Sequence, residues 1–258
     1  MPKIKVISDL HMEGSSFQYE NHGEDTLLLV GDIHTRNRLH ELLKQIPLDV
    51  RVFFVSGNHE FYHGVFELCN QYFKQLEDQF PNYTFLNNTA DRVGDIPIYG
   101  GTMFTDFMLY GPGEAWFCEH RSKDGINDFT VMKKLGQHFE PVNWTTTDHK
   151  LQHDHFKQGL EVFLRNTEGA PFRIVMSHFM PSDVCTAPQF KGSTLNPYFT
   201  ANMERYMGWP GLWVTGHGHF PMEHDMDGTR IIMNPKGYRL SGGKMENPRF
   251  KPDLVIDV

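Results

Sequence analysis

Cysteine is scarce in this sequence, with only 3 cysteines among 258 residues: Cys69, Cys118 and Cys185. They form no CxxC motif and no paired spacing, which argues against a disulfide framework and against a thiolate zinc site. We therefore expect the three cysteines to fill space in the fold.

Long apolar runs are also missing. No stretch approaches the roughly 18 consecutive apolar residues that a membrane span requires. The first residues, MPKIKVISDLH, lead directly into an apolar strand that ends in charged residues, which is not the pattern of a signal or transit peptide. These features predict a soluble protein, located in the cytoplasm, with no membrane partner.

Positive charge is in deficit, with 24 basic residues against 32 acidic ones and a formal net charge of −8. Because acidic residues outnumber basic ones, an extended electrostatic contact with a nucleic-acid backbone is not expected. Any polyanion would need a local positive centre. The 15 histidines could contribute to one, because imidazole is the commonest metal ligand.

The sequence contains no low-complexity linker and no repeat, so we expect one domain spanning residues 1–258. Short apolar runs predict strands, and helical periodicity predicts helices at 37–46, 65–80, 148–166 and 198–208. Strand and helix alternate, which favours an α/β or layered α/β/β/α class. The predicted strands cover residues 3–8, 26–31, 51–56, 96–101, 172–177, 212–216, 229–234 and 254–258.

Five of these strands are followed directly by polar side chains. These are Asp9 and His11, Asp32, Asn58 with His59 and Glu60, His178, and His217 with His219. Ligands bind beyond the carboxyl ends of strands in such sheets, so we expect these side chains to converge there.

The converging side chains combine two aspartates, an asparagine and several histidines, with no thiolate. Carboxylate, amide and imidazole ligands suit Mn, Fe, Zn or Ni better than Ca²⁺. Seven ligands exceed the need of one four-coordinate ion and suit two ions that share a carboxylate. Two such ions, roughly 3.5 to 4 Å apart, can activate a water between them and stabilise an in-line displacement at phosphorus.

The motifs SDLH, GD, GNHE, SH and GHGH, in this order and spacing, resemble the calcineurin-like metallophosphoesterase superfamily. The segments GGTMFTDF, MNPKGY and ENPRFKPDLVIDV resemble its compact bacterial and phage members, so the resemblance covers nearly the whole chain. It implies a four-layer α/β/β/α sandwich of two mixed β-sheets flanked by helices.

The resemblance also implies roles for individual residues. Asp9, His11, Asp32 and His219 would hold one ion, and Asp32, Asn58, His178 and His217 the other, with Asp32 bridging. His59 would be the general acid, and Glu60 a structural carboxylate. Two divalent transition-metal ions are the expected cofactors, with manganese first and iron, zinc, nickel or magnesium as alternatives.

Three departures from the family pattern matter. The protein-phosphatase motif GDxxDRG stands here as GDIHTRN: Arg36 keeps the position of the phosphate-binding arginine, but Thr35 replaces the aspartate that supports the acid histidine. The usual GHTH is GHGH, and His178 is followed by Phe179 rather than by a second histidine. The first departure disfavours a protein phosphatase.

Residues 102–147 are the least regular part of the sequence, and we expect an insertion there that overhangs the metals and selects the substrate. Asn127 and Asp128 are its candidate contacts. Aromatic residues in this segment could line a substrate pocket, although core packing is the favoured interpretation: Phe104, Phe107, Tyr110, Trp116 and Phe117. His149, His153 and His155 are expected on a solvated helix face.

The function predicted from the sequence is hydrolysis of a phosphodiester or phosphomonoester by a metal-bridging hydroxide, with His59 as acid and Arg36 near the phosphate. The expected partner is a small phosphoester, possibly a nucleotide. A nuclease of the same superfamily and a non-catalytic metal-binding scaffold are the alternatives. The sequence leaves the oligomeric state, the native metal and the natural substrate open.

Overall fold

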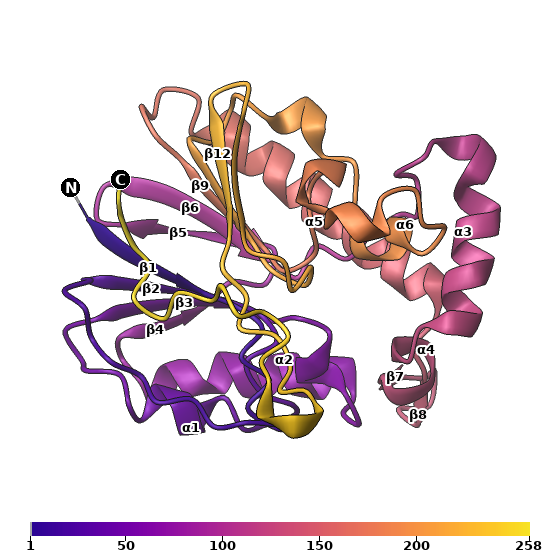
Figure 1. The fold of residues 1–258 in the computed structure, drawn as a ribbon, viewed down its shortest axis with the longest axis horizontal. Coiled ribbons are helices and arrows are strands. Elements are labelled where there is room, and N and C mark those ends of the chain that lie inside the picture. The colour runs from indigo at the N-terminus through magenta and orange to yellow at the C-terminus, as the bar shows by residue number, and fades with distance from the viewer. Residues whose placement is uncertain (1) are drawn as a thin grey trace.

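The computed structural model describes residues 2–258 and places two large β-sheets face to face, with helices on the outside (Figure 1). The first sheet has the strand order β13-β1-β2-β3-β4, in which β1 to β4 are parallel and β13 is antiparallel to β1. Its strands are β13 (Val255–Asp257), β1 (Lys3–Ile7), β2 (Thr26–Val30), β3 (Arg51–Val55) and β4 (Tyr83–Phe85).

The second sheet has the order β11-β12-β10-β9-β6-β5. The four inner strands are parallel, and the two edge strands are antiparallel to their neighbours. Its strands are β11 (Met222–Met226), β12 (Thr229–Met233), β10 (Leu212–Thr215), β9 (Ile174–Ser177), β6 (Ile96–Gly101) and β5 (Thr89–Val93). A separate hairpin pairs β7 (Lys133–Leu135) with β8 (Pro141–Asn143).

Helices cover the outer faces of both sheets, which gives the four layers seen in Figure 1. Helices α1 and α2 lie against the first sheet, and α5 lies against the second. The helices are α1 (His40–Leu43), α2 (Phe66–Gln75), α3 (Pro112–Gly125), α4 (Asp128–Val131), α5 (Thr146–Asn166) and α6 (Asn196–Phe199). The predicted fold class is therefore confirmed.

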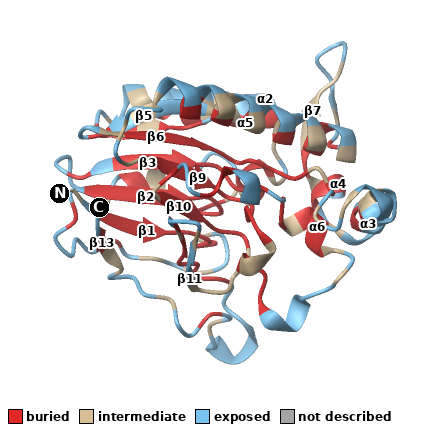
Figure 2. Cartoon of the chain, turned by 90° about the horizontal axis from the view of Figure 1, so that it is seen from above, coloured by how far each residue is buried: buried red, intermediate tan, exposed pale blue. Residues whose placement is uncertain are grey.

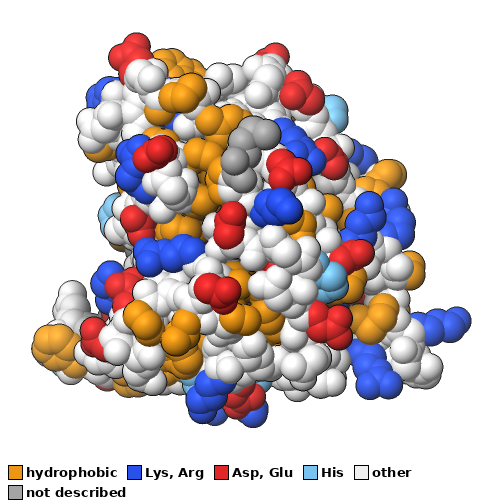
Figure 3. Space-filling view, turned by 90° about the vertical axis from the view of Figure 1, so that its left-hand side faces the viewer, with side chains coloured by type: hydrophobic (Ala, Val, Ile, Leu, Met, Phe, Trp, Pro, Cys, Tyr) orange, Lys and Arg blue, Asp and Glu red, His pale blue; other side chains and the backbone are white. Residues whose placement is uncertain are grey.

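Burial on both faces explains why the strands read as continuous apolar runs. Val6 and Leu28 pack between the sheets, whereas Ile7 and Leu29 belong to the core under the helices. Figure 2 shows the inner strands of the sheets buried and the outer faces of α2 and α5 exposed. On the face that carries both chain ends, basic and acidic side chains are intermingled (Figure 3). Among the described residues, no helix combines the length and the apolar character that crossing a membrane requires.

Helix α5 matches its prediction closely because its start and its buried face are both encoded locally. Thr145 and Asp148 form a reciprocal capping box at its first turn. Phe156, Leu160 and Phe163 then place one apolar stripe against the sheet. The expectation of a solvated face was wrong for His149 and His153, which are buried, because they continue the buried stripe of Phe156 and Leu160 along the same side of the helix. His155 is exposed as expected.

The helix predicted at 198–208 is wrong. Helix α6 ends at Phe199, and the chain continues in extended form because it bonds to the segment after β9: the main-chain N–H groups of Ala201 and Met203 donate to the carbonyls of Met180 and Pro181. The helix predicted at 37–46 is reduced to the four residues of α1.

Residues 102–147 are more regular than predicted, because they contain the 14-residue helix α3, helix α4 and the β7-β8 hairpin. Phe104 and Phe107 are buried in the core, whereas Tyr110, Trp116 and Phe117 are exposed. The favoured core interpretation of these aromatics is thus right for the first two and wrong for the other three.

Candidate metal centre

The predicted ligand side chains come together at the carboxyl ends of five strands. Asp9 and His11 follow β1, Asp32 follows β2, and Asn58 follows β3, all in the first sheet. His178 follows β9, and His217 and His219 follow β10, in the second sheet. Because β1, β2 and β3 are neighbours and β9 and β10 are neighbours, their ends meet on one side of the sandwich.

Two clusters of ligand-type atoms result, each with all its atoms within 4.8 Å of one another. We call Asp9, His11 and His219 the outer half-site, and Asp32, His178 and His217 together with Asn58 the inner half-site. A third overlapping group joins His11, Asp32 and His59, so Asp32 faces both halves.

Imidazole nitrogens face each other within both half-sites. His11 Nε2 lies 3.0 Å from His219 Nε2, and His178 Nε2 lies 3.2 Å from His217 Nδ1. Asn58 Oδ1 and His217 Nε2 are buried and have no hydrogen-bond partner within residues 2–258. Buried polar atoms normally have partners, so these atoms fit a group that they would hold, and divalent ions match the donor set.

Main-chain N–H groups orient the two aspartates. Asp32 Oδ1 accepts from the main-chain N–H of His59 at 2.9 Å, and Asp9 Oδ1 accepts from that of His217 at 3.0 Å. Burial alone would raise the pKa of Asp32, but His178 and His59 hold it well below its usual value. Both carboxylates are therefore ionised and available as ligands at neutral pH.

The backbone of the half-sites is unusual. Asp9, His11, Asp32, His217 and His219 all adopt the left-handed conformation, with φ between 44° and 66°. This conformation costs a residue with a Cβ atom roughly 1–2 kcal/mol and concentrates at functional sites. Five such residues in one place support a functional rather than a structural origin of the polar clusters.

Glycines allow the strand ends to approach closely. A Cβ atom on Gly57 would lie 2.1 Å from Asp32 Oδ1, and one on Gly31 would lie 2.3 Å from His178 Nδ1. Glycine at position 57 therefore leaves space beside the carboxylate of Asp32.

Glu60 holds the inner half-site from behind. It is fully buried, and its carboxylate accepts main-chain N–H groups from Gly57, Asp32, Ile33 and His34. Burial and the nearby Asp32 raise the pKa of Glu60 to about 7. Its position agrees with the structural role suggested by the resemblance.

A carboxylate that the sequence analysis missed contacts His59. Glu13 Oε1 lies 3.1 Å from His59 Nδ1 and 3.0 Å from His11 Nδ1. Burial would raise the pKa of Glu13, but its contacts with the two histidines lower it to about 2. Glu13 thus occupies the supporting role that Thr35 cannot fill, and its position two residues after His11 was the only available signal.

Tyr238 and Glu246 were missed as well. The Tyr238 hydroxyl lies 2.9 Å from His59 Nε2, and its ring packs 4.1 Å from the ring of His11, measured between centroids. Glu246 Oε2 lies 2.7 Å from His219 Nδ1. Burial opposes it, but the contacts with Asp9 and Glu246 raise the pKa of His219 to about 10. Both residues lie in the MNPKGY and ENPRF segments, which carry the resemblance but no metal-type pattern.

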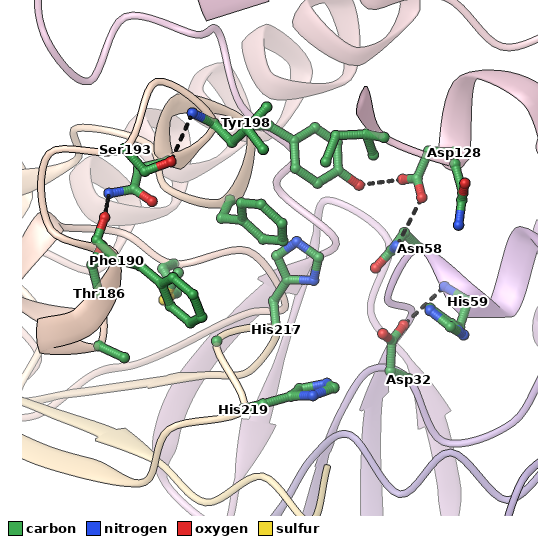
Figure 4. Close-up of a pocket in the computed structure, with 18 of the residues that line it drawn as sticks. Asp32, Asn58, His59, Asp128, Thr186, Phe190, Ser193, Tyr198, His217 and His219 are labelled. Carbon is green, nitrogen blue, oxygen red and sulfur yellow. Dashed lines mark hydrogen bonds between the residues drawn. The ribbon is translucent and has the colours of Figure 1, made fainter. Parts of the chain in front are cut away.

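The predicted contact Asp128 lies at the start of α4 and is fully buried. Its Oδ1 accepts from Asn58 Nδ2 at 3.0 Å and from the Tyr62 hydroxyl at 2.7 Å, and its Oδ2 accepts from the Tyr198 hydroxyl (Figure 4). Because Asp128 takes the amide N–H of Asn58, the amide oxygen is left facing the half-site. Asn127 lines the cavity beside it.

Arg36 is the one predicted site residue that the structure does not bring to the centre. Its side chain is exposed and lines a separate surface hollow with His63 and Cys69. The loop after Asp32 turns away there, because Glu60 binds the main-chain N–H groups of Ile33 and His34.

Comparisons with known proteins agree with this geometry. A family model described as calcineurin-like phosphoesterase matches residues 2–221. An uncharacterised protein of Acanthamoeba polyphaga mimivirus is 24% identical over 286 residues, which cover 99% of this chain and 96% of that protein.

Two solved structures share the fold. Phosphopantetheinyl hydrolase from Mycobacterium tuberculosis superposes with a TM-score of 0.69 at 17% identity, covering 97% of this chain and 98% of that one. A protein from Thermus thermophilus superposes with a TM-score of 0.53 at 11% identity, covering 92% and 91%. At these identities the structural likeness concerns the fold alone.

Proposed function

The chain belongs to the calcineurin-like phosphoesterase family and is a hydrolase of phosphoester bonds, and we propose a mechanism for it. In this mechanism the substrate is cleaved by in-line displacement at phosphorus, and His59 is the general acid. The substrate is a small phosphodiester or phosphomonoester. The observation that carries the proposal is the convergence of seven ligand-type side chains from five strand ends into two half-sites.

The outer half-site would hold one divalent ion and the inner half-site the other, with Asp32 contributing to both. When bound, such ions supply a water of lowered pKa and neutralise negative charge on the phosphoryl oxygens. Mn²⁺ is the first ion to test, and Fe, Zn, Ni and Mg are alternatives for the same carboxylate, amide and imidazole donors.

In this proposal His59 delivers a proton to the departing oxygen, and its contacts support that role. Glu13 accepts from Nδ1, which fixes the ring and leaves Nε2 directed at the Tyr238 hydroxyl on the cavity wall. Burial opposes protonation of His59, but the charges of Asp32 and Glu13 raise its pKa, which favours the form that can act as an acid. Arg36 has no part in this mechanism, because it lies outside the cavity.

The name of the Mycobacterium tuberculosis structure suggests one substrate to include in a screen, a phosphopantetheinyl ester. A nuclease receives no support from the site, because no Lys or Arg of the described chain lines the cavity.

The test measures hydrolysis of bis(p-nitrophenyl) phosphate and p-nitrophenyl phosphate by metal-stripped protein titrated with each ion, together with the number of ions bound per chain. Wild type should gain activity with metal and bind about two ions per chain. Asp32→Ala should lose at least about 100-fold in kcat/KM and bind fewer ions. His59→Ala should lose activity but keep its ions.

Asp91→Ala, which removes a half-buried carboxylate of β5 that pairs with Arg51 and does not line the cavity, is the matched control and should behave as wild type. Stoichiometric ion binding without turnover of any ester would contradict the catalytic proposal and favour the scaffold alternative.

A further inference from the structure

The cavity that contains the half-sites continues beyond them. It has a volume of about 450 Å³, and one end is formed by Asp32, His59, His217 and His219. The other end, which we call the apolar lobe, is lined by Ile126, Met180, Ala187, Phe190, Leu195 and Phe199. Figure 4 shows Phe190 and Thr186 on the far side of His217 from Asn58 and Asp32.

The lobe has no positive charge to offer a ligand. Among the residues that the structure describes, no Lys or Arg lines any part of the cavity. Lys191, which follows Phe190 in the sequence, is paired with Asp183 at 2.8 Å. A second phosphate or a carboxylate on the substrate would therefore find no charged partner in the lobe.

The carboxylates of the cavity wall outside the half-sites are already engaged. Asp128 accepts from Asn58, Tyr62 and Tyr198, and Glu246 contacts His219 and the main-chain N–H of Tyr238. The remaining polar groups of the lobe are uncharged, from Asn127, Thr186, Ser193 and Asn196. A cationic substrate group would thus also lack a free partner.

Apolar surface in the lobe remains open to solvent. Phe190 lines the cavity, and the residue as a whole is 57% exposed. A ligand that covered Phe190 and Leu195 would remove apolar surface from water, at roughly 25 cal/mol per Å². Aromatic ligand groups would gain further from the rings of Phe190 and Phe199.

We propose that the apolar lobe binds the organic group of the substrate, and that this group is uncharged and apolar or aromatic. The inference rests on the proposed function, since the half-sites would hold the phosphoryl group next to the lobe. It narrows the substrate class to esters with a single phosphoryl group and a neutral organic group, and it disfavours polyphosphates and nucleic acids. Selection then lies in segment 180–199 as much as in the predicted segment 102–147, which contributes only Gly125, Ile126, Asn127 and Asp128.

The experiment measures binding rather than turnover. Isothermal titration calorimetry compares methylphosphonate, phenylphosphonate and 4-carboxyphenylphosphonate on the Mn²⁺-loaded protein. Phenylphosphonate should bind about tenfold more tightly than methylphosphonate, because the phenyl ring enters the lobe. The added carboxylate should remove most of that gain.

A double variant, Phe190→Ala with Leu195→Ala, should reduce the preference for phenylphosphonate to below about threefold. Far-UV circular dichroism of the variant, compared with that of wild type, shows that it is folded. Trp116→Ala is the matched control, because Trp116 is an exposed aromatic of α3 that does not line the cavity, and it should keep the full preference.

If wild type binds phenylphosphonate and methylphosphonate with equal affinity, the proposed role of the apolar lobe is contradicted, even if model esters are hydrolysed. Tight binding of 4-carboxyphenylphosphonate would contradict it as well. A phenyl preference that the double variant loses would support the lobe even if no ester is turned over, in which case only the catalytic proposal fails. Failure of all three phosphonates to bind the metal-loaded protein would overturn both.

Discussion

The two half-sites use the same kinds of ligand but are supported by different kinds of neighbour. The outer half-site is braced by charge: Glu13 and Glu246, whose side chains are 26% and 35% exposed, contact His11 and His219. The inner half-site is braced by groups that are buried: His178 Nδ1 contacts the carbonyl of Val30, and the His217 ring lies 4.2 Å from that of Phe179. The buried carboxylate of Asp128, on α4, accepts from Asn58 and fixes it.

This difference means that similar ligands should respond differently to the same perturbation. Electrostatic support at a partly exposed position weakens with salt, whereas packing in a buried position weakens when a side chain is shortened. The support of the outer half-site should therefore weaken as the salt concentration rises. The support of the inner half-site should weaken when a side chain is shortened.

The largest expected effect comes from shortening one histidine in each half. His178→Ala and His219→Ala should each lose about 100-fold or more in metal affinity, because each removes a ligand. Only His178→Ala should also destabilise the metal-free fold substantially, by about 2–4 kcal/mol, since His178 is fully buried between strand ends.

Urea unfolding of the metal-stripped variants provides the measurement. His155→Ala, an exposed histidine of α5, is the control and should unfold as wild type does. An equal loss of stability in the two half-site variants would break the comparison.

A smaller effect should follow from the supporting carboxylates. Asp128→Ala should reduce kcat/KM by about 10- to 100-fold, because Asn58 loses the acceptor that orients it. The loss should be the same at low and high salt, since Asp128 is fully buried.

Glu246→Gln should cost about tenfold or less, and that loss should shrink as salt rises, because Glu246 acts through charge at the rim. The same assay at two ionic strengths measures both variants, with Glu223→Gln on β11 as an exposed control. Identical salt dependence for the Asp128 and Glu246 variants would contradict the proposed difference, in which partly exposed charges support the outer half-site and buried groups support the inner half-site.

The smallest expected effect concerns pH and a histidine behind the inner half-site. His149 is fully buried and stacks on Tyr198, with ring centroids 5.1 Å apart. Burial and the neighbouring His153 hold the pKa of His149 well below its usual value. The unfolded chain therefore takes up a proton near pH 6.5 that the folded chain refuses, so stability should fall as pH drops below 6.5.

Between about pH 7.5 and pH 5.5 wild type should lose roughly 1 kcal/mol more than His149→Phe. Urea unfolding at both pH values measures the difference, and His155→Phe on the exposed side of α5 should leave the slope unchanged. A ring titration of His149 near pH 6.5 by NMR in the folded protein would contradict this prediction without depending on the variant.

The sequence predicted the central strands of both sheets better than edge strands such as β4, and it predicted the convergence of the polar side chains, because central strands and strand-end residues depend on local signals. A buried strand is a short apolar run, and each ligand follows its strand directly, as Asp32 follows β2 and His178 follows β9. The convergence of the ligands then follows from parallel strand order alone.

The neighbours of the ligands could not be predicted in this way. Glu13 and Glu246 look like ordinary surface carboxylates in the sequence, and their roles depend on contacts with His59 and His219. His149 looked solvated because charged residues surround it in the sequence, yet the aromatic rings that bury it come from distant segments. The extended path after α6 likewise depends on pairing with the segment after β9.

The left-handed backbone at five of the ligands has a consequence for how this site could be lost. Glycine adopts that conformation freely, so it is the residue that the fold itself would prefer at Asp9, His11 and Asp32. Substitution by glycine at these positions would relieve the backbone strain, but it would also remove the ligand-type side chains. A relative that keeps this fold but carries glycines at the strand ends would therefore lack the ligand-type side chains. Against that substitution stand the chemistry of these side chains and the main-chain N–H groups of His217 and His59, which donate to Asp9 and Asp32.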